Sequence, residues 1–332
     1  MPKFNLETLR QLAVQVLENS RVSRKNSISV ANALIAAEAD GISSHGLSRL
    51  LGYCDQALSG KVDGFATPVE EFPVTGVIRV DAKSGFAYPA IDAALRACEN
   101  ISKESSIIGI AISNSHHAGV LGYHVERFAK LGFIAMGFTN SPAAIAPWGG
   151  NRALFGTNPI AFACPRKGAP PIVIDLSLSK VPRSRITLAA EKGEQIPLGW
   201  AVNSDGQGVQ DPRAALLGTL LPIGEAKGAA LALMVEIMTA GITGSNFGFQ
   251  ASSFFSAEGD PPHIGQFFLV FDPKPFSGDT FFIRTEILCE AISSQSGARL
   301  PGERRFETRK KNKLESIDIP KHLVESLKKR LP

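Results

Sequence analysis

Apolar residues recur every three or four positions near the start of the chain. The spacing predicts one helix over residues 6–17 and a second, rich in alanine, over residues 29–39. A third helix is expected to open with Ser43 or Ser44 as its N-cap and to continue through residues 50 and 51. Together these segments predict a helical unit at the N-terminus.

Short apolar runs alternate with helical segments over the rest of the chain. Runs typical of buried strands lie at residues 77–80, 107–112, 133–139, 160–164, 171–175 and 266–271. Helices are predicted at residues 90–101, 229–240, 285–293 and 319–331. Another is predicted to start in the turn at residues 114–120 and to end at residue 130. Residues 193–222 are rich in Gly and Pro and predict a long irregular excursion on the surface.

Composition places the chain among ordinary globular proteins. Its 332 residues, 44% of them hydrophobic, are enough for a large core and about two domains. The net charge of +4 is small for this length and gives no reason to expect nucleic acid or a membrane surface as a partner. Residues 299–313 are locally basic, but no aromatic interleaving or groove-reading motif accompanies the charges, so nucleic-acid binding is a weak alternative.

The cysteines and the termini indicate the compartment. Four widely spaced cysteines without a CxxC pair read as small core residues in a reducing environment: Cys54, Cys98, Cys164 and Cys289. The chain shows no signal-peptide pattern at its start and no run of 18 apolar residues. We therefore expect a soluble cytoplasmic protein that does not enter a membrane.

The first candidate for chemistry is the pair His45 and Arg49. If the predicted third helix forms, these side chains are i and i+4 neighbours on one face. Imidazole exchanges a proton near neutral pH, and guanidinium grips a carboxylate through two parallel hydrogen bonds. The pair suits a small anionic substrate, although His and Arg on a solvated helix face would give the same spacing.

Other candidates concern a cofactor or a metal. The chain has no G-x-G-x-x-G motif, so any dinucleotide would bind through helix N-termini and scattered basic residues. The helix starts after His117 and Lys227 are candidates for that role. We expect no metal, because the adjacent residues His116 and His117 would point in different directions and no ligand lies at zincin-like spacing.

Two polar residues, one at the end of a predicted strand and one in a predicted turn, could bind a ligand or could only stabilise the local backbone. Asp175 ends an apolar strand, where it would contact a ligand or cap the following turn. Thr157 lies in a turn flanked by Gly and Pro, where its hydroxyl would bind a carboxylate or stabilise the turn.

Taken together, the motifs resemble the malate/L-lactate dehydrogenase-like family of NAD(P)-dependent oxidoreductases, which lacks a Rossmann fold. The resemblance runs from about residue 6 to residue 305 and rests on the order and spacing of short motifs. These lie at residues 43–46 with Arg49, and at residues 114–117, 140–142, 155–159, 175–179, 199–201, 227–228, 234–236 and 300–305.

The resemblance implies an α+β fold with a large mixed β-sheet. A helical N-terminal region, residues 1–74, would be joined by a C-terminal helix at residues 312–332, and residues 75–311 would form the cofactor-binding and catalytic domain. It also implies NAD or NADP as cofactor and a homodimer with its sites at the subunit contact.

Site roles carry over from the family by position. The residue matching His45 transfers the proton with the serine matching Ser44 beside it, and the residue matching His116 is its rival for that role. The positions of Arg49 and Thr157 hold the substrate. Cofactor contacts are implied for His117, Ala118, Gly119, Val120, Leu121, Asn140, Ser141, Asp175, Leu176, Ser177, Lys227, Gly228, Gly302, Glu303, Arg304 and Arg305.

One departure bears on the substrate. Cyclic-imine reductases of the family carry a relay aspartate where this chain has Arg185. A cation there cannot serve as the carboxylate of a relay, but it can attract a second anionic group on the substrate. We therefore expect hydride transfer to a small 2-oxo acid resembling malate, lactate or sulfolactate. Reduction of a cyclic imine, Δ1-piperideine-2-carboxylate or Δ1-pyrroline-2-carboxylate, is the alternative enzyme activity, and a catalytically silent metabolite-binding protein is the alternative of another class.

Overall fold

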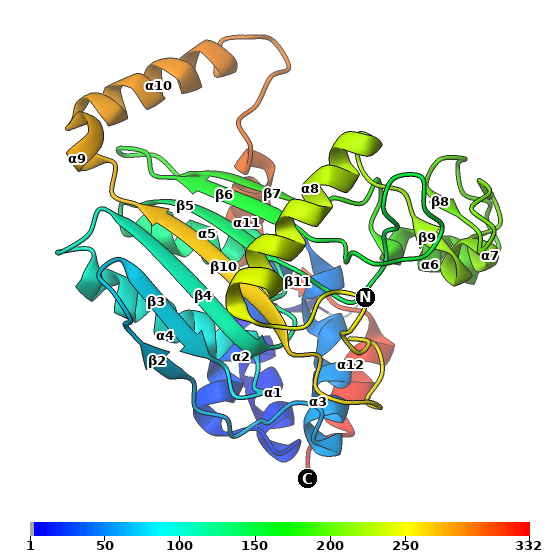
Figure 1. Ribbon diagram of the computed structural model, residues 1–332. Coiled ribbons are helices and arrows are strands. Elements are labelled where there is room, and N and C mark those ends of the chain that lie inside the picture. The colour runs from blue at the N-terminus through cyan, green and yellow to red at the C-terminus, as the bar shows by residue number, and fades with distance from the viewer. Residues whose placement is uncertain (1–2) are drawn as a thin grey trace.

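A seven-stranded mixed sheet runs through the middle of the computed structural model, which describes residues 3–332 (Figure 1). Its neighbouring strands are, in order, β2 (Val69–Glu71), β3 (Val77–Asp81), β4 (Ile107–Ser115), β10 (Ile264–Phe271), β5 (Ile134–Thr139), β6 (Ile160–Cys164) and β7 (Ile172–Leu176). Only β3 and β4 pair in parallel; the other neighbours within the described residues are antiparallel. The predicted mixed sheet with flanking helices is confirmed.

Helices cover both faces of this sheet. Alternate residues of β4, Ile108, Ile110 and Ile112, lie in the core formed with α4 (Ala87–Ile101) and α5 (Leu121–Lys130). Phe267 of β10 points to the opposite face, where it packs with α8 (Ala226–Glu236). The strands are therefore buried on both faces, which explains why they read as continuous apolar runs.

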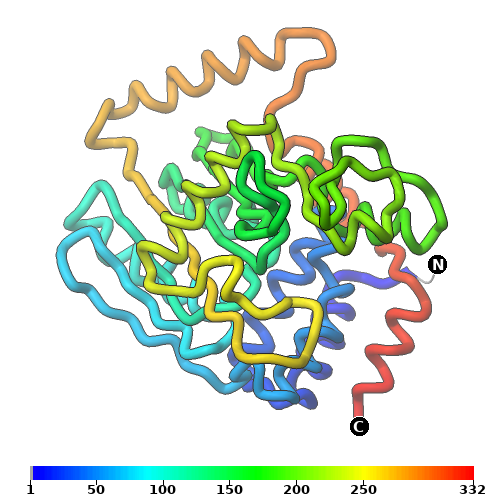
Figure 2. Tube along the Cα trace, turned by 45° about the vertical axis from the view of Figure 1, so that its right-hand side comes forward, coloured from blue at the N-terminus to red at the C-terminus, as the bar shows by residue number. Residues whose placement is uncertain are grey.

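The two ends of the chain pack together. Helices α1 (Leu6–Asn19), α2 (Arg24–Ala39) and α3 (Leu50–Ser59) share one core with α12 (Lys321–Lys328), and β1 (Lys3–Phe4) pairs with β11 (Ile317–Asp318). Figure 2 shows the red C-terminal helix beside the blue N-terminal segments. The division of the chain at residues 74 and 311 stays a prediction.

The excursion expected at residues 193–222 is more ordered than predicted. It contributes α7 (Pro212–Leu217) and the paired strands β8 (Ala201–Val202) and β9 (Thr219–Leu220), which pack with α6 (Arg183–Lys192) around a small core of their own (Figure 1). Elements this short contain too few residues to show a hydrophobic period. The frequent Gly and Pro residues therefore predicted irregular structure.

Several helix bounds also differ from the expected ones. The helix expected at residues 285–293 is α10 (Thr280–Ser293), preceded by the short α9 (Lys274–Ser277). The helix expected at residues 229–240 is α8, which continues as a π-helical turn, Ile237–Gly241.

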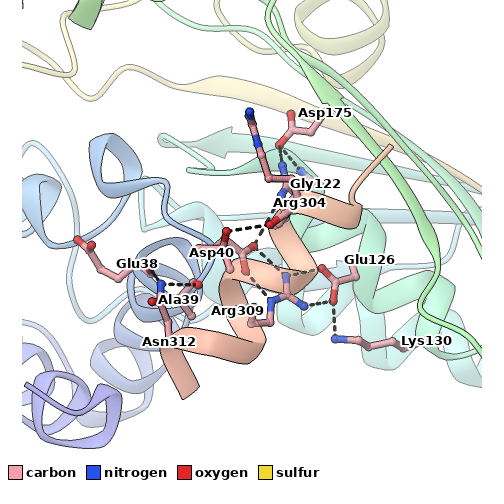
Figure 3. Close-up of polar contacts among 12 residues, drawn as sticks. Glu38, Ala39, Asp40, Gly122, Glu126, Lys130, Asp175, Arg304, Arg309 and Asn312 are labelled. Atoms are coloured by element: carbon pink, nitrogen blue, oxygen red, sulfur yellow. Dashed lines mark hydrogen bonds and ion pairs between the residues drawn. The ribbon is translucent and has the colours of Figure 1, made fainter. Parts of the chain in front are cut away.

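A helix that was not predicted, α11 (Glu303–Leu314), connects the sheet to the N-terminal helices (Figure 3). The Arg309 guanidinium donates to the Asp40 carboxylate at 2.8 Å and to the Glu126 carboxylate at 2.7 Å. The Asn312 amide donates to the carbonyl oxygen of Ala39 at 3.0 Å. Much of the basic segment at residues 299–313 is thus a helix with arginines turned into the molecule.

Within residues 3–332, no helix combines the length and the apolar character needed to cross a bilayer.

Candidate active site

The segment that contains His45 and Arg49 forms two separate 3₁₀ turns, Ser43–His45 and Leu47–Arg49, rather than one helix. The chain changes direction between them at Gly46, with φ −96° and ψ −139°. The buried Glu38 carboxylate accepts a hydrogen bond from the Leu47 N–H at 2.7 Å, and a Cβ at position 46 would lie only 2.2 Å from it. The predicted i, i+4 pairing on one helix face is therefore wrong, as is the predicted N-cap role of Ser43 or Ser44.

Ser44 instead links the two side chains. Its hydroxyl lies 3.0 Å from His45 Nδ1, and its carbonyl oxygen accepts a hydrogen bond from Arg49 Nε at 2.9 Å. Burial and then the nearby Arg49 cation lower the pKa of His45 to about 4. At neutral pH the result is an uncharged imidazole near a held guanidinium.

Two further histidines lie on the loop between β4 and α5. The helix expected directly after them begins at Leu121, so neither is helical. The ring centres of His117 and His45 are 5.5 Å apart. His116 is fully buried, and neither of its ring nitrogens has a hydrogen-bond partner among residues 3–332. Burial and then Lys61 lower the pKa of His116 to about 3.

A segment that the sequence did not suggest, residues 253–258, packs against these histidines. The Phe254 ring centre lies 5.2 Å from that of His116 and 5.0 Å from that of His117. The Arg49 guanidinium carbon lies 4.8 Å from the Phe255 ring centre. The segment therefore forms an aromatic wall beside the candidate catalytic groups.

The wall is fastened to α3 and the residues after it. The buried Lys61 ammonium donates to the carbonyl oxygens of Ser253, Ser256 and Glu258 at 2.7, 3.0 and 2.7 Å. Gln56 Nε2 donates to the carbonyl oxygens of Phe254 and Ser256 at 2.9 and 3.1 Å.

Replacing Lys61 with Met should loosen this segment, because three carbonyl oxygens lose their shared donor. We expect faster amide hydrogen exchange across residues 253–258, with exchange in β4 and β10 unchanged. Lys25→Met, an exposed lysine on α2, is the matched control. Unchanged exchange in the segment would show that Gln56 suffices to hold it.

Thr157 lies in a turn that is held by hydrogen bonds to Glu236. The buried Glu236 carboxylate accepts hydrogen bonds from the Gly156 N–H at 3.2 Å and from the Asn158 and Asn140 side-chain amides at 2.9 and 3.3 Å. The Thr157 N–H donates to Ser141 Oγ at 3.1 Å. The structure thus brings Thr157, Asn140 and Ser141 together around the buried Glu236 carboxylate, a role that the sequence around Glu236 did not indicate.

Some of the expected cofactor residues meet where α5 and α11 begin. The Asp175 carboxylate accepts from the Gly122 N–H at 2.9 Å and from Arg305 at 3.4 Å. Burial raises the pKa of Asp175 although both of these donors lower it. Arg305 Nη1 is buried and has no partner among the described residues, and a Cβ at Gly122 would lie 2.5 Å from it. An unpartnered guanidinium nitrogen beside a glycine in the first turn of α5 suits an anionic group such as a dinucleotide phosphate.

The other expected residues lie in several places. Ala118 to Leu121 form the approach to α5, and Leu176 and Ser177 follow Asp175 at the end of β7. Gly302 and Glu303 begin α11, while Arg304 is exposed. Lys227 is exposed in the first turn of α8, and Gly228 is required there because a Cβ would lie 1.8 Å from the Ile223 carbonyl oxygen.

Arg185 lies outside these hydrogen-bonded groups. It is exposed on α6, with its guanidinium carbon 5.9 Å from the Trp200 ring centre. It makes no hydrogen bond with His45, Arg49 or Thr157 within residues 3–332. Residues 3–332 contain no cluster of three His, Cys, Asp or Glu side chains that could hold a metal ion.

Comparison with known proteins gives matches over nearly the whole chain. The sequence pattern of the malate/L-lactate dehydrogenase family matches residues 4–328. The chain is 50% identical to (2R)-3-sulfolactate dehydrogenase (NADP(+)) of Chromohalobacter salexigens over 98% of this chain and 97% of that protein. It is 40% identical to a Delta(1)-pyrroline-2-carboxylate/Delta(1)-piperideine-2-carboxylate reductase of Pseudomonas syringae pv. tomato, over 88% and 85% of the two chains. The crystal structure of delta1-piperideine-2-carboxylate reductase from that organism superimposes with a TM-score of 0.94 at 37% identity, covering 99% of this chain and all of the other.

Proposed function

Because this chain belongs to the malate/L-lactate dehydrogenase family, we propose that it transfers hydride between NADP or NAD and C2 of a small 2-hydroxy or 2-oxo acid. The chain is an NAD(P)-dependent oxidoreductase, and the 50% identical relative is named for NADP(+) and for sulfolactate, a 2-hydroxy acid with a second anionic group. We propose a substrate of that type, with sulfolactate and malate as the first two to test.

The observation that carries this proposal is the arrangement of His45, Ser44 and Arg49. Arg49 is held by the Ser44 carbonyl oxygen at 2.9 Å, which leaves the outer nitrogens of its guanidinium to grip a carboxylate. The imidazole beside it is neutral and held through Nδ1 at 3.0 Å from Ser44 Oγ. Nε2 of His45 is then the nitrogen that takes the proton from a 2-hydroxyl group.

In the direction of reduction, His45 returns that proton to the substrate oxygen. Burial is the main cause of the low pKa of His45 and the Arg49 cation is the second, so a carboxylate bound to Arg49 would cancel the smaller of the two effects and move the pKa of His45 upward. Thr157, on the turn fixed by Glu236, is also proposed to hold the substrate. Arg185 is proposed as a contact for the second anionic group, since its guanidinium is exposed.

The nicotinamide cofactor supplies or accepts the hydride when it is bound. The residues proposed to hold it are those at the starts of α5, α8 and α11 together with Asn140, Ser141 and Asp175 to Ser177. Two features support this assignment, the orphaned Arg305 Nη1 and the close approach allowed by Gly122. Arg304, exposed one residue before Arg305, is available for the additional phosphate of NADP.

Reduction of a cyclic imine is the second candidate function. It is favoured by the similarity to the pyrroline-2-carboxylate reductases and by the aromatic wall of Phe254 and Phe255, which would suit an apolar ring. The first candidate is preferred because Arg185 stands where the reductases carry a relay aspartate.

We also propose that the protein is a cytoplasmic homodimer. Figure 1 shows α10 standing away from the body of the molecule, and four of its apolar residues or near neighbours are exposed, namely Phe276, Ile283, Ile287 and Leu288. An apolar face of this kind on a projecting helix suits a second copy of the chain. The four buried free cysteines support a reducing compartment.

A panel of substrates and cofactors tests the function. We expect NADPH oxidation with 3-sulfopyruvate and oxaloacetate to exceed that with pyruvate and with pyrroline-2-carboxylate, measured by absorbance on purified protein. Faster turnover of the imine would make the protein a cyclic-imine reductase. No turnover of any of the four, with NADPH still bound, would favour the silent binding protein.

A further inference from the structure

A buried chain of hydroxyl groups ends on His117. The Tyr53 hydroxyl lies 2.6 Å from His117 Nδ1 and 3.0 Å from the Tyr88 hydroxyl. Both tyrosines are 2% exposed, and neither hydroxyl has any other hydrogen-bond partner among residues 3–332. Burial raises the pKa of Tyr53 to about 12, so this phenol carries its proton at neutral pH.

The number of protons available to these three side chains favours one direction for the two hydrogen bonds. If Tyr88 donates to Tyr53 and Tyr53 donates to His117 Nδ1, both buried hydroxyl protons are used. If His117 Nδ1–H donated to Tyr53 instead, the proton of either Tyr53 or Tyr88 would be buried without an acceptor. An unpaired buried donor is costly, so the first arrangement is favoured.

The tautomer of His117 follows from this arrangement. Nδ1 accepts a hydrogen bond and the ring is neutral, since burial, Arg49 and the neighbouring histidines lower the pKa of His117. The ring proton is therefore on Nε2, which has no partner among the described residues. The ring is half-buried, and its centre lies 5.5 Å from that of His45, so one atom can be within hydrogen-bond reach of both rings.

We infer that His117 is a hydrogen-bond donor to the substrate oxygen that His45 serves, and that Tyr53 is the positioning residue that keeps its proton on Nε2. The inference deepens the proposed function and rests on it. A neutral imidazole N–H stabilises charge that develops on a carbonyl oxygen without giving up its proton. The two histidines would then have different roles: His45 transfers the proton and His117 polarises the carbonyl group.

The tautomer is measurable without any substrate. In protein labelled with ¹⁵N-histidine, two-bond nitrogen–proton correlations show which ring nitrogen is protonated, and the signals of His117 are those lost in His117→Gln. We expect Nε2–H in the wild type, a mixture of tautomers in Tyr53→Phe, and Nε2–H again in the matched variant Tyr88→Phe. Nδ1–H in the wild type would overturn the inference whether or not the enzyme is a dehydrogenase.

Kinetics then test the contact with substrate. The amide nitrogen of Gln reaches the place of Nε2 and that of Asn the place of Nδ1, so His117→Gln keeps the donor that His117→Asn removes. We expect kcat to fall by about 10-fold or less in His117→Gln and by about 100-fold or more in His117→Asn, with similar Kd values for NADPH. Equal losses, or a loss confined to NADPH binding, would show that His117 does not donate to the substrate.

Discussion

Replacing His45 with Ala should reduce kcat by about 10²–10⁴-fold while NADPH still binds. The imidazole lies 3.0 Å from the Ser44 hydroxyl, and the carbonyl oxygen of the same serine holds Arg49 Nε at 2.9 Å. Its removal takes away the proton acceptor for oxidation and the proton donor for reduction, but none of the residues proposed to hold the cofactor. Steady-state turnover in both directions and a fluorescence titration with NADPH measure the two effects separately.

The control for this variant is His322→Ala. His322 is exposed on α12, so its removal should change neither turnover nor NADPH binding. His116→Ala separates the two candidates for proton transfer, because His116 is buried without a polar partner and is expected to affect stability more than chemistry. Near-normal turnover in His45→Ala, with a large loss in His116→Ala, would transfer the role to His116.

The strands could be predicted from sequence because local composition determines them. Residues 107–112 and 266–271 are apolar without interruption, and a sheet covered on both faces requires that pattern. The helix α11 could not be predicted in this way. Its inward-facing Arg309 becomes suitable for the interior only through carboxylates 269 and 183 residues away in the sequence.

The same distinction applies to the site. His45, Ser44 and Arg49 could be identified from their residue types and from the family resemblance, but their arrangement depends on Glu38, which accepts the Leu47 N–H and requires glycine at position 46. The aromatic wall was missed because Lys61 fastens it from almost 200 residues earlier. Likewise, the tyrosine that would set the tautomer of His117 is 64 residues away from it.

Replacing Arg309 with Met should destabilise the protein by about 3–5 kcal/mol, because it leaves Asp40 without its main cationic partner and Glu126 with only Lys130. The side chains of Asp40 and Glu126 are 1% and 2% exposed, so water cannot replace the guanidinium. We expect a thermal unfolding midpoint lower by about 5 °C, measured by calorimetry. Arg10→Met, which breaks an exposed pair with Glu7 on α1, should leave the midpoint nearly unchanged.

The effect of Arg309→Met should depend on pH in a defined direction. Burial raises the pKa of Glu126, but hydrogen bonds from Arg309 and Lys130 outweigh burial and hold it below its usual value. A carboxyl group with a lowered pKa in the folded state contributes its stability above the pKa of the unfolded chain and loses it as the pH falls. The difference in midpoint between wild type and variant should therefore be full at pH 7 and shrink only as the pH falls below 4.5, the ordinary pKa of this carboxyl group, toward pH 3. A constant difference across that range would mean that Arg309 stabilises the fold through packing of its stem rather than through its charge.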